Sequence, residues 1–242
     1  MPKETSLLAK NIVTNYSEGK LQSIKAHSPK SAKSPLPLEQ LYTQNNPFWK
    51  RATDIIGAIM GLLLFSPLML AIVIAVKLTS KGPIFFVQER TGQNLCRFKM
   101  YKFRTMIQEA AQQLDRIQDL NEMSGPLIKM KEDPRLSPIG GLLRKTSLDE
   151  LPQLFNILKG DMTIVGPRAL SPLPSQYANW QLRRFYVKPG ITCTWQAERR
   201  GEMDFTEWMR CDLKYMDRVS FWMDIRVLVK TVLRVISLRG AH

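Results

Sequence analysis

The feature that most constrains this chain is a run of 22 residues without a charged side chain, from Ile55 to Val76. A helix of this length is about 33 Å long, and the hydrocarbon core of a bilayer is about 30 Å thick. A buried helix in a soluble protein is a poor alternative at this length. We therefore predict a membrane segment.

The path of this segment depends on its centre and its flanks. Pro67 lies near the middle, where it lacks a backbone donor and favours a kink, and Ser66 can hydrogen-bond a freed carbonyl. Lys50 and Arg51 precede the run, and Lys77 opens a cationic stretch after it. Because positive flanks stay in the cytoplasm, we predict a re-entrant helix–break–helix hairpin broken at Ser66-Pro67. A spanning helix is the alternative.

Composition divides the chain into three parts. Residues 1–46 are rich in Lys, Ser, Pro, Gln and Asn, which predicts a disordered basic N-terminal arm. Residues 47–79 form the predicted membrane anchor. Residues 80–242 have enough apolar residues for a core, and we predict an α+β, mainly helical domain there, facing the cytoplasm.

The net charge of +14 calls for an anionic partner, such as a phosphorylated substrate, anionic lipid or nucleic acid. Nucleic acid is disfavoured because the cations are spread over loops and membrane flanks rather than gathered in a recognition motif. The chain has only two histidines, both in polar ends, so carboxylates are the main candidates for chemistry. Three widely spaced cysteines indicate neither a disulfide framework nor a zinc site.

Two further segments have recognisable patterns. Residues 84–88 and 97–102 have β-type composition and flank the turn-rich residues 91–94, which predicts a β-hairpin. From Phe205 to about Leu238, apolar residues dominate and cations recur at every fourth position, at 226, 230 and 234. This pattern predicts a basic amphipathic helix lying on the membrane surface. A helix that packs on the domain with a solvated basic edge is the alternative.

Asp149 and Glu150 are the most prominent acids of the chain. Leucines recur around them at roughly helical spacing, so we predict a helix from Leu142 to Leu158, interrupted at Pro152. Neighbours on a helix differ by about 100° in direction, but both acids could border one cleft. One could then attack a substrate while the other holds a metal, or the pair could simply be an exposed acidic face. Arg168, after Gly166-Pro167, suits a phosphate-binding site.

Several motifs occur in an order that resembles one family. They are Lys50-Arg51, Ser66-Pro67, Gly82 to Gly92, Tyr101 to Met106, Arg144 to Gln153, Gly160-Asp161-Met162, Gly166-Pro167-Arg168 and Lys188 to Thr192. Over residues 48 to 240 the chain resembles the bacterial sugar transferases, the monotopic polyprenyl-phosphate phosphoglycosyl transferases. It is most similar to small, catalytic-core members of the exopolysaccharide type.

The resemblance implies an activity and its partners. Such enzymes transfer a sugar 1-phosphate from a UDP-sugar to undecaprenyl phosphate, release UMP and use Mg²⁺. This step initiates polysaccharide or glycoconjugate synthesis at the bacterial inner membrane, where the protein also contacts phospholipid.

The resemblance also implies roles for individual residues. Asp149 matches the nucleophile, which forms a covalent phosphosugar intermediate, and Glu150 matches the metal-binding acid. Lys102 and Arg168 match active-site cations. Further residues are expected to bind substrate: Arg144, Arg200, Asp212 and Tyr215.

Two other functions are compatible with parts of the sequence. A glycosyltransferase that releases UDP would transfer sugar without phosphate. A non-enzymatic membrane scaffold would explain the anchor and the charge, but not the combination of Asp149, Glu150, Arg168 and Lys102.

Overall fold

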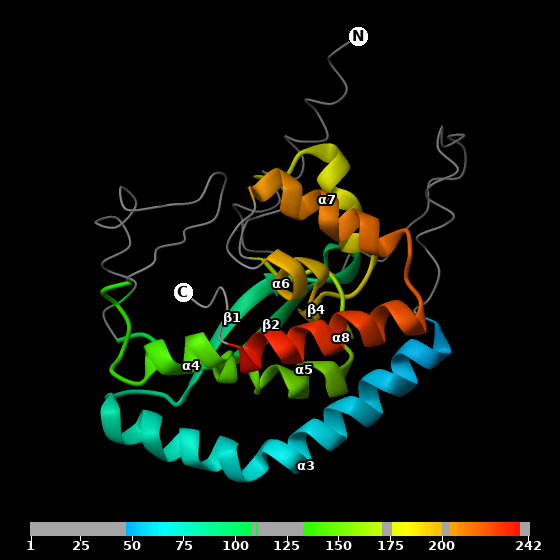
Figure 1. Ribbon diagram of the computed structural model, residues 1–242. Coiled ribbons are helices and arrows are strands. Elements are labelled where there is room, and N and C mark those ends of the chain that lie inside the picture. Colours follow the sequence, from blue (N-terminus) through cyan, green and yellow to red (C-terminus); the bar gives the residue numbers. More distant parts are fainter. Residues whose placement is uncertain (1–46, 108–109, 111–132, 171–175, 200–203, 238–242) are drawn as a thin grey trace. The chain divides into compact units, whose positions relative to one another are not determined.

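The structure is a computed structural model, in which residues 47–107, 110, 133–170, 176–199 and 204–237 are described (Figure 1). They contain helices and two small two-stranded sheets, so the predicted α+β, mainly helical class is confirmed. The predicted N-terminal arm, residues 1–46, lies outside the described residues.

The uncharged run forms the middle of one helix, α3 (Phe48–Thr79), of 32 residues. The predicted interruption between two helices is wrong, because α3 is continuous through Pro67, but its axis bends near the middle (Figure 1). In a regular helix the Pro67 nitrogen would donate to the Leu63 carbonyl. The Ser66 hydroxyl donates to that carbonyl instead, at 3.0 Å, as the sequence predicted. The helix therefore loses one backbone donor without leaving its acceptor unpaired.

Both halves of α3 pack on the domain. Ala58, in the first half, is fully buried in a cluster with Ile157 and Met162. In the second half, Ile72 and Val76 are buried in another cluster. Between these contacts most of the large apolar side chains are exposed, and by length and composition α3 can cross a membrane.

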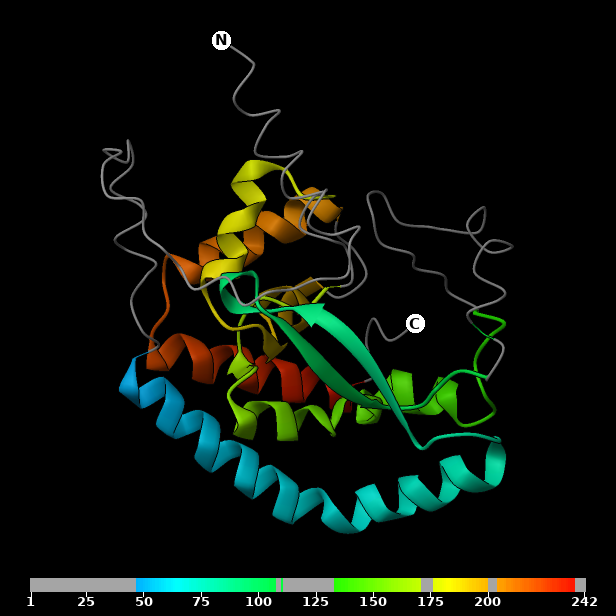
Figure 2. The same ribbon diagram turned by 180° about the vertical axis from the view of Figure 1, so that it is seen from behind.

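The predicted β-hairpin is confirmed. Strands β1 (Phe85–Thr91) and β2 (Arg97–Phe103) pair antiparallel, from Phe85 opposite Phe103 to Thr91 opposite Arg97, and cross the front of Figure 2. They are joined through η1 (Gln93–Leu95), a short 3₁₀ turn. The apolar end of the hairpin packs near α3, because Phe103 and Ile84 join the cluster of Ile72 and Val76.

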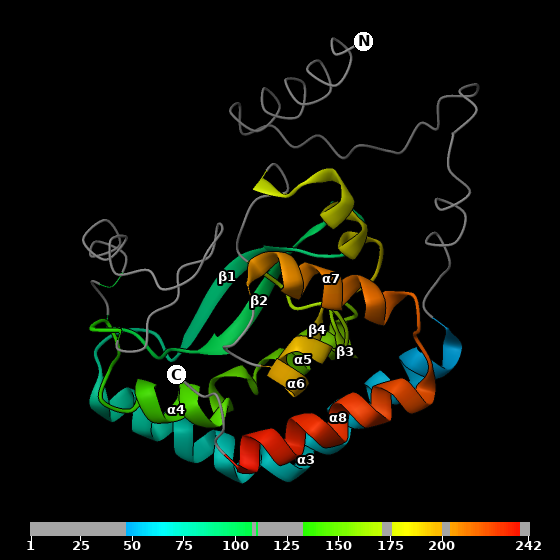
Figure 3. The same cartoon turned by 45° about the horizontal axis from the view of Figure 1, so that its top comes forward.

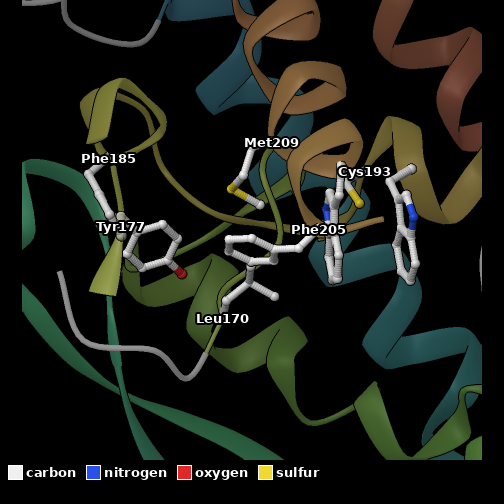
Figure 4. Close-up of a cluster of buried hydrophobic side chains, with 8 residues drawn as sticks. Leu170, Tyr177, Phe185, Cys193, Phe205 and Met209 are labelled. Atoms are coloured by element: carbon white, nitrogen blue, oxygen red, sulfur yellow. The ribbon is translucent and has the colours of Figure 1, made fainter. Parts of the chain in front are cut away.

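The rest of the domain is built from short elements. In chain order they are α4 (Gly140–Thr146), η4 (Leu148–Glu150), α5 (Gln153–Lys159), β3 (Thr163–Val165), η6 (Asn179–Tyr186), β4 (Gly190–Thr192), α6 (Thr194–Arg199), α7 (Phe205–Met216) and α8 (Phe221–Ile236). β3 and β4 pair parallel. An aromatic cluster joins η6, α6 and α7, and within it Trp195 and Trp208 stack at 3.9 Å between ring centroids (Figure 4).

The single amphipathic helix predicted from Phe205 to about Leu238 is wrong, because this segment forms two helices, α7 and α8. α8 overlaps α3 in the view of Figure 3, and the two helices meet at their N-terminal ends, where Lys50 pairs with Asp224. α8 exposes most of its large apolar side chains, including Trp222 at 77%. Two cations of α8 contact α6. Lys230 pairs with Glu198 at 2.7 Å, and Arg234 donates to the Glu198 carbonyl. The apolar face of α8 is thus exposed, while part of its basic edge contacts α6.

Candidate active site

Asp149 and Glu150 lie on one 3₁₀ turn, η4, between two short helices. The helix predicted from Leu142 to Leu158 is interrupted over a longer stretch than at Pro152 alone: α4 ends before Ser147, which has a left-handed backbone (φ 57°), and α5 begins only after Pro152. The Glu150 N–H closes the turn on the Ser147 carbonyl at 3.2 Å. Both acids are only 7% exposed, so the interpretation as an exposed acidic face is also wrong.

Glu150 is held by two cations. Lys102 Nζ, from β2, lies 3.0 Å from Glu150 Oε1. Arg168 contacts both oxygens, through Nη2 to Oε1 and through Nη1 to Oε2 at 3.3 Å. Burial alone would raise the pKa of Glu150, but Arg168 and then Lys102 outweigh it and hold the pKa well below its usual range. Glu150 is therefore ionised and fixed in place.

Asp149 has a different environment. Burial raises its pKa above the usual value, with Glu150 acting in the same direction, while Lys102, Arg144 and Arg168 oppose the shift. Among the described residues no hydrogen bond to its carboxylate is found. The two adjacent acids thus differ in their contacts and in the direction of their pKa shifts: Glu150 is held by two cations, and the Asp149 carboxylate has no hydrogen-bond partner among the described residues.

Two glycines position Arg168. A Cβ on Gly190 would lie 2.2 Å from the Gly166 nitrogen, so only glycine allows the two backbones to approach this closely. The contact joins the segments Gly166-Pro167-Arg168 and Lys188-Pro189-Gly190, and a β-bridge pairs Arg168 with Gly190. The two motifs singled out in the sequence are therefore one structural unit that presents Arg168 to Glu150.

Arg144 borders the site from α4. Its Nε donates to Thr105 Oγ1 at 3.1 Å, and its Nη1 lies 3.6 Å from Asp133 Oδ2. These contacts orient Arg144, which acts on Asp149 through its charge. Thr105 and Asp133 had no predicted role; the contact of Thr105 with Arg144 joins residues 39 positions apart, which no local pattern reveals.

Asp212 and Arg184 form a second buried ion pair, at 2.9 Å between Oδ2 and Nη2, with side chains 1% and 3% exposed. Arg184 Nη2 also donates to the backbone carbonyl of Arg168 at 2.6 Å. Asp212 was predicted to bind substrate. The structure places it behind the loop that carries Arg168, where it braces that loop through Arg184. Arg184 was missed, because a cation among several in one segment carries no distinguishing signal.

Tyr215 lies in a separate buried cluster. Its hydroxyl donates to Asp224 Oδ1 at 2.6 Å, lies 3.0 Å from the Val165 carbonyl oxygen, and accepts from Lys50 Nζ at 3.1 Å. This cluster ties the start of α3 to β3 and α8. Tyr215 is thus linked to the anchor rather than grouped with Asp149. Arg200 lies outside the described residues.

A metal would rely largely on substrate atoms. No group of three or more His, Cys, Asp or Glu side chains is arranged to bind a metal within the described residues. Mg²⁺ is commonly held by one or two carboxylates together with substrate phosphates. Glu150 suits this arrangement: Oε1 accepts from two cations and Oε2 only from Arg168, so Oε2 keeps a free lone pair.

Comparison with known proteins decides the family. Residues 45–238 match the model of the bacterial sugar transferases. The chain belongs to the bacterial sugar transferase family. The family prediction made from the sequence motifs is therefore confirmed, over nearly the same residues.

Curated relatives cover this sugar transferase chain to different extents. It is 39% identical to the galactosyl transferase CpsE of Streptococcus agalactiae serotype III, over 84% of this chain and 45% of that protein. It is 36% identical to the exopolysaccharide production protein ExoY of Rhizobium meliloti, over 80% of this chain and 88% of that protein. It is 40% identical to the UDP-glucose:undecaprenyl-phosphate glucose-1-phosphate transferase of Xanthomonas campestris pv. campestris, over 80% of this chain and 40% of that protein. The chain thus spans less than half of two of these relatives and most of the third.

Proposed function

We propose that this chain transfers a sugar 1-phosphate from a UDP-sugar to undecaprenyl phosphate and releases UMP, which initiates a polysaccharide or glycoconjugate. The observation that carries the proposal is the pairing of a buried, unclamped Asp149 with a Glu150 held by Lys102 and Arg168. A relative's name states the same donor and acceptor type, a UDP-sugar and undecaprenyl phosphate.

The reaction proceeds in two displacements at one phosphorus. The ionised Asp149 carboxylate attacks the phosphorus that carries the sugar, and the bond from that phosphorus to the bridging oxygen breaks. UMP leaves with the electron pair, and the sugar phosphate stays on Asp149. A phosphate oxygen of undecaprenyl phosphate then attacks the same phosphorus, and the Asp149 carboxylate is expelled. Lys102 and Arg168 stabilise negative charge on the phosphoryl oxygens during both steps.

Mg²⁺ is the cofactor in this proposal, with Glu150 as its protein ligand through Oε2. The ion would neutralise diphosphate charge and so reduce repulsion of an anionic nucleophile. Lys102 and Arg168 hold the Glu150 carboxylate in the ionised form that a metal ligand requires.

The anchor supports a re-entrant path in the cytoplasmic leaflet of the bacterial inner membrane. Residues near the start of α3 and near its end both pack on the same catalytic domain. A helix that crossed the bilayer would separate these two contacts by the membrane. The exposed apolar faces of α3 and α8 then lie in lipid, which brings Asp149 to the depth of the lipid phosphate head group.

The product nucleotide tests the proposal. The purified chain in lipid nanodiscs is incubated with Mg²⁺, undecaprenyl phosphate and each of several UDP-sugars, and the released nucleotide is identified by chromatography. UMP is expected with at least one donor. Release of UDP would instead support a glycosyltransferase, and release of neither nucleotide across the donor panel would support a scaffold.

A further inference from the structure

Arg90 is a half-buried cation without an assigned role. It lies on β1, and its guanidinium Nη2 donates to Gln88 Oε1 at 2.6 Å. Its Nε and Nη1 atoms are buried and have no hydrogen-bond partner among the described residues. An unpaired buried guanidinium N–H is costly, so this arrangement points to an anion that pairs with it.

The strand register places Arg90 on the catalytic face of the hairpin. Residues directly opposite each other in an antiparallel pair share a face, and alternate residues of one strand do so too. Arg90 lies opposite Phe98, and Lys102 is four residues further along β2. Arg90 and Lys102 therefore project from the same face, separated by about 13 Å along the strand.

The charges around Arg90 belong to the active site. Burial, together with the positive charge of Arg168, lowers the pKa of Arg90 to about 10, while Tyr177 and Glu150 oppose the shift. Arg168 directs both of its terminal nitrogens to Glu150. Arg90 therefore has buried donor atoms, Nε and Nη1, that no described residue pairs with, within the electrostatic reach of Arg168 and Glu150.

We propose that Arg90 binds a phosphate oxygen of the nucleotide-sugar donor, a role that rests on the proposed function. The soluble donor is favoured over the lipid acceptor because of the direction of the hairpin. Its Phe85–Phe103 end joins the cluster of Ile72 and Val76 in the anchor. Its turn end, next to Arg90, contacts η6, where Gln93 Nε2 donates to the Tyr186 carbonyl at 2.9 Å. Lys102 is thus nearer the anchor, and Arg90 lies toward the end that a soluble nucleotide reaches.

The test measures the binding of UDP, which does not require turnover. Arg90→Gln removes the charged, planar guanidinium, which can donate two hydrogen bonds to one phosphate. Arg90→Lys keeps the positive charge without this paired geometry. Arg97→Gln is the matched control, because Arg97 lies on the same hairpin in a partly exposed ion pair with Glu89. By calorimetry in nanodiscs, Arg90→Gln should weaken UDP binding by about 10- to 100-fold, Arg90→Lys by less, and Arg97→Gln by under about twofold.

Steady-state kinetics separates the two phosphate substrates. The KM for the UDP-sugar should rise in both Arg90 variants, while the KM for undecaprenyl phosphate stays unchanged. Parental UDP affinity in a folded Arg90→Gln protein would overturn the proposal, as would a change confined to the lipid acceptor. If Arg90→Gln does not fold, the same readouts on Arg90→Lys decide. A parent protein that binds UDP through Arg90 but releases no UMP would refute the proposed function and leave the Arg90 site standing.

Discussion

Two buried clusters of oppositely charged side chains lie on either side of the loop that carries Arg168, and they differ in their contacts. In the first, Glu150 is contacted by Lys102 and Arg168, and the residue directly before it, Asp149, has a carboxylate without a hydrogen-bond partner among the described residues. In the second, Asp212 pairs with Arg184 alone, and both side chains are almost completely enclosed. The first cluster has two cations for its two acids, and both cations contact the same acid, which leaves the Asp149 carboxylate without an ion-pair partner within contact distance among the described residues. The second is one pair that also bonds the loop backbone, as a structural brace requires.

The largest effect is expected from Asp149→Asn. The amide cannot form the covalent intermediate, so UMP release should fall by about 10⁴-fold or more. Because burial raises the pKa of Asp149 in the folded protein, ionisation of this side chain destabilises the fold at neutral pH. The variant should therefore melt at or above the temperature of the parent at pH 7, and this difference should shrink as the pH falls. An active Asp149→Asn protein would remove Asp149 from the reaction.

Glu150→Gln should have the next largest effect. The loss of the clamped charge is expected to lower kcat/KM by about 10²- to 10³-fold and to raise the Mg²⁺ concentration for half-maximal rate by about tenfold or more. Glu150 raises the pKa of Asp149, so its neutralisation should also move the acid limb of the pH–rate profile to lower pH. An unchanged Mg²⁺ dependence would exclude the metal-binding role.

Two substitutions of Asp212 distinguish a structural role for this residue from a substrate-binding role. Asp212→Ala leaves Arg184 buried without its partner and should lower the free energy of unfolding by about 3–5 kcal/mol, measured by denaturant titration. Asp212→Asn keeps an acceptor for Arg184, so its UDP affinity should stay within about threefold of the parent. A stable Asp212→Asn protein with strongly weakened UDP binding would restore the substrate-binding role implied by the family resemblance.

The same pair gives a pH dependence of stability. Burial raises the pKa of Asp212 to about 6, although Arg184 opposes the shift. The folded protein then binds this proton more tightly than the unfolded chain, whose Asp pKa is about 3.9. The contribution of Asp212 to stability is therefore fully present below about pH 4 and is lost as the pH rises through 6. The free energy of unfolding of Asp212→Asn should lack this decline, which parallel titrations would show.

The smallest effect concerns the surface of α8. In vesicles of brominated phospholipid, Trp222 should account for much of the quenched tryptophan fluorescence, because it is 77% exposed on the apolar face. Trp222→Phe should reduce the quenching, with little effect on activity. Trp180→Phe is the matched control, since Trp180 is 40% exposed on η6, away from α8. Equal quenching in the parent and Trp222→Phe would place this face outside the bilayer.

The sequence predicted features that depend on local patterns. The hairpin followed from strand composition around a turn, and the Ser66 hydrogen bond to Leu63 followed from the missing donor of Pro67. The sequence did not predict that α3 stays helical through Pro67. Packing of both halves of α3 on the domain favours one continuous helix, and this packing is not visible in the local sequence.

The different states of Asp149 and Glu150 could not be derived from their positions. Lys102 lies 48 residues before Glu150, and Arg168 lies 18 residues after it. Only the fold shows that both cations reach the second acid and leave the first free. The brace at Arg184 and the unpaired donors of Arg90 depend in the same way on contacts that no local spacing reveals.

Acceptor-free labelling tests the central assignment most directly. The parent is incubated with Mg²⁺ and a UDP-sugar that supports turnover, without undecaprenyl phosphate, and intact-protein mass spectrometry is followed by peptide mapping. The account predicts one added sugar phosphate on Asp149, an equal amount of UMP, and discharge of the adduct when undecaprenyl phosphate is added. An adduct on another residue, or an unchanged adduct in Asp149→Asn, would contradict it.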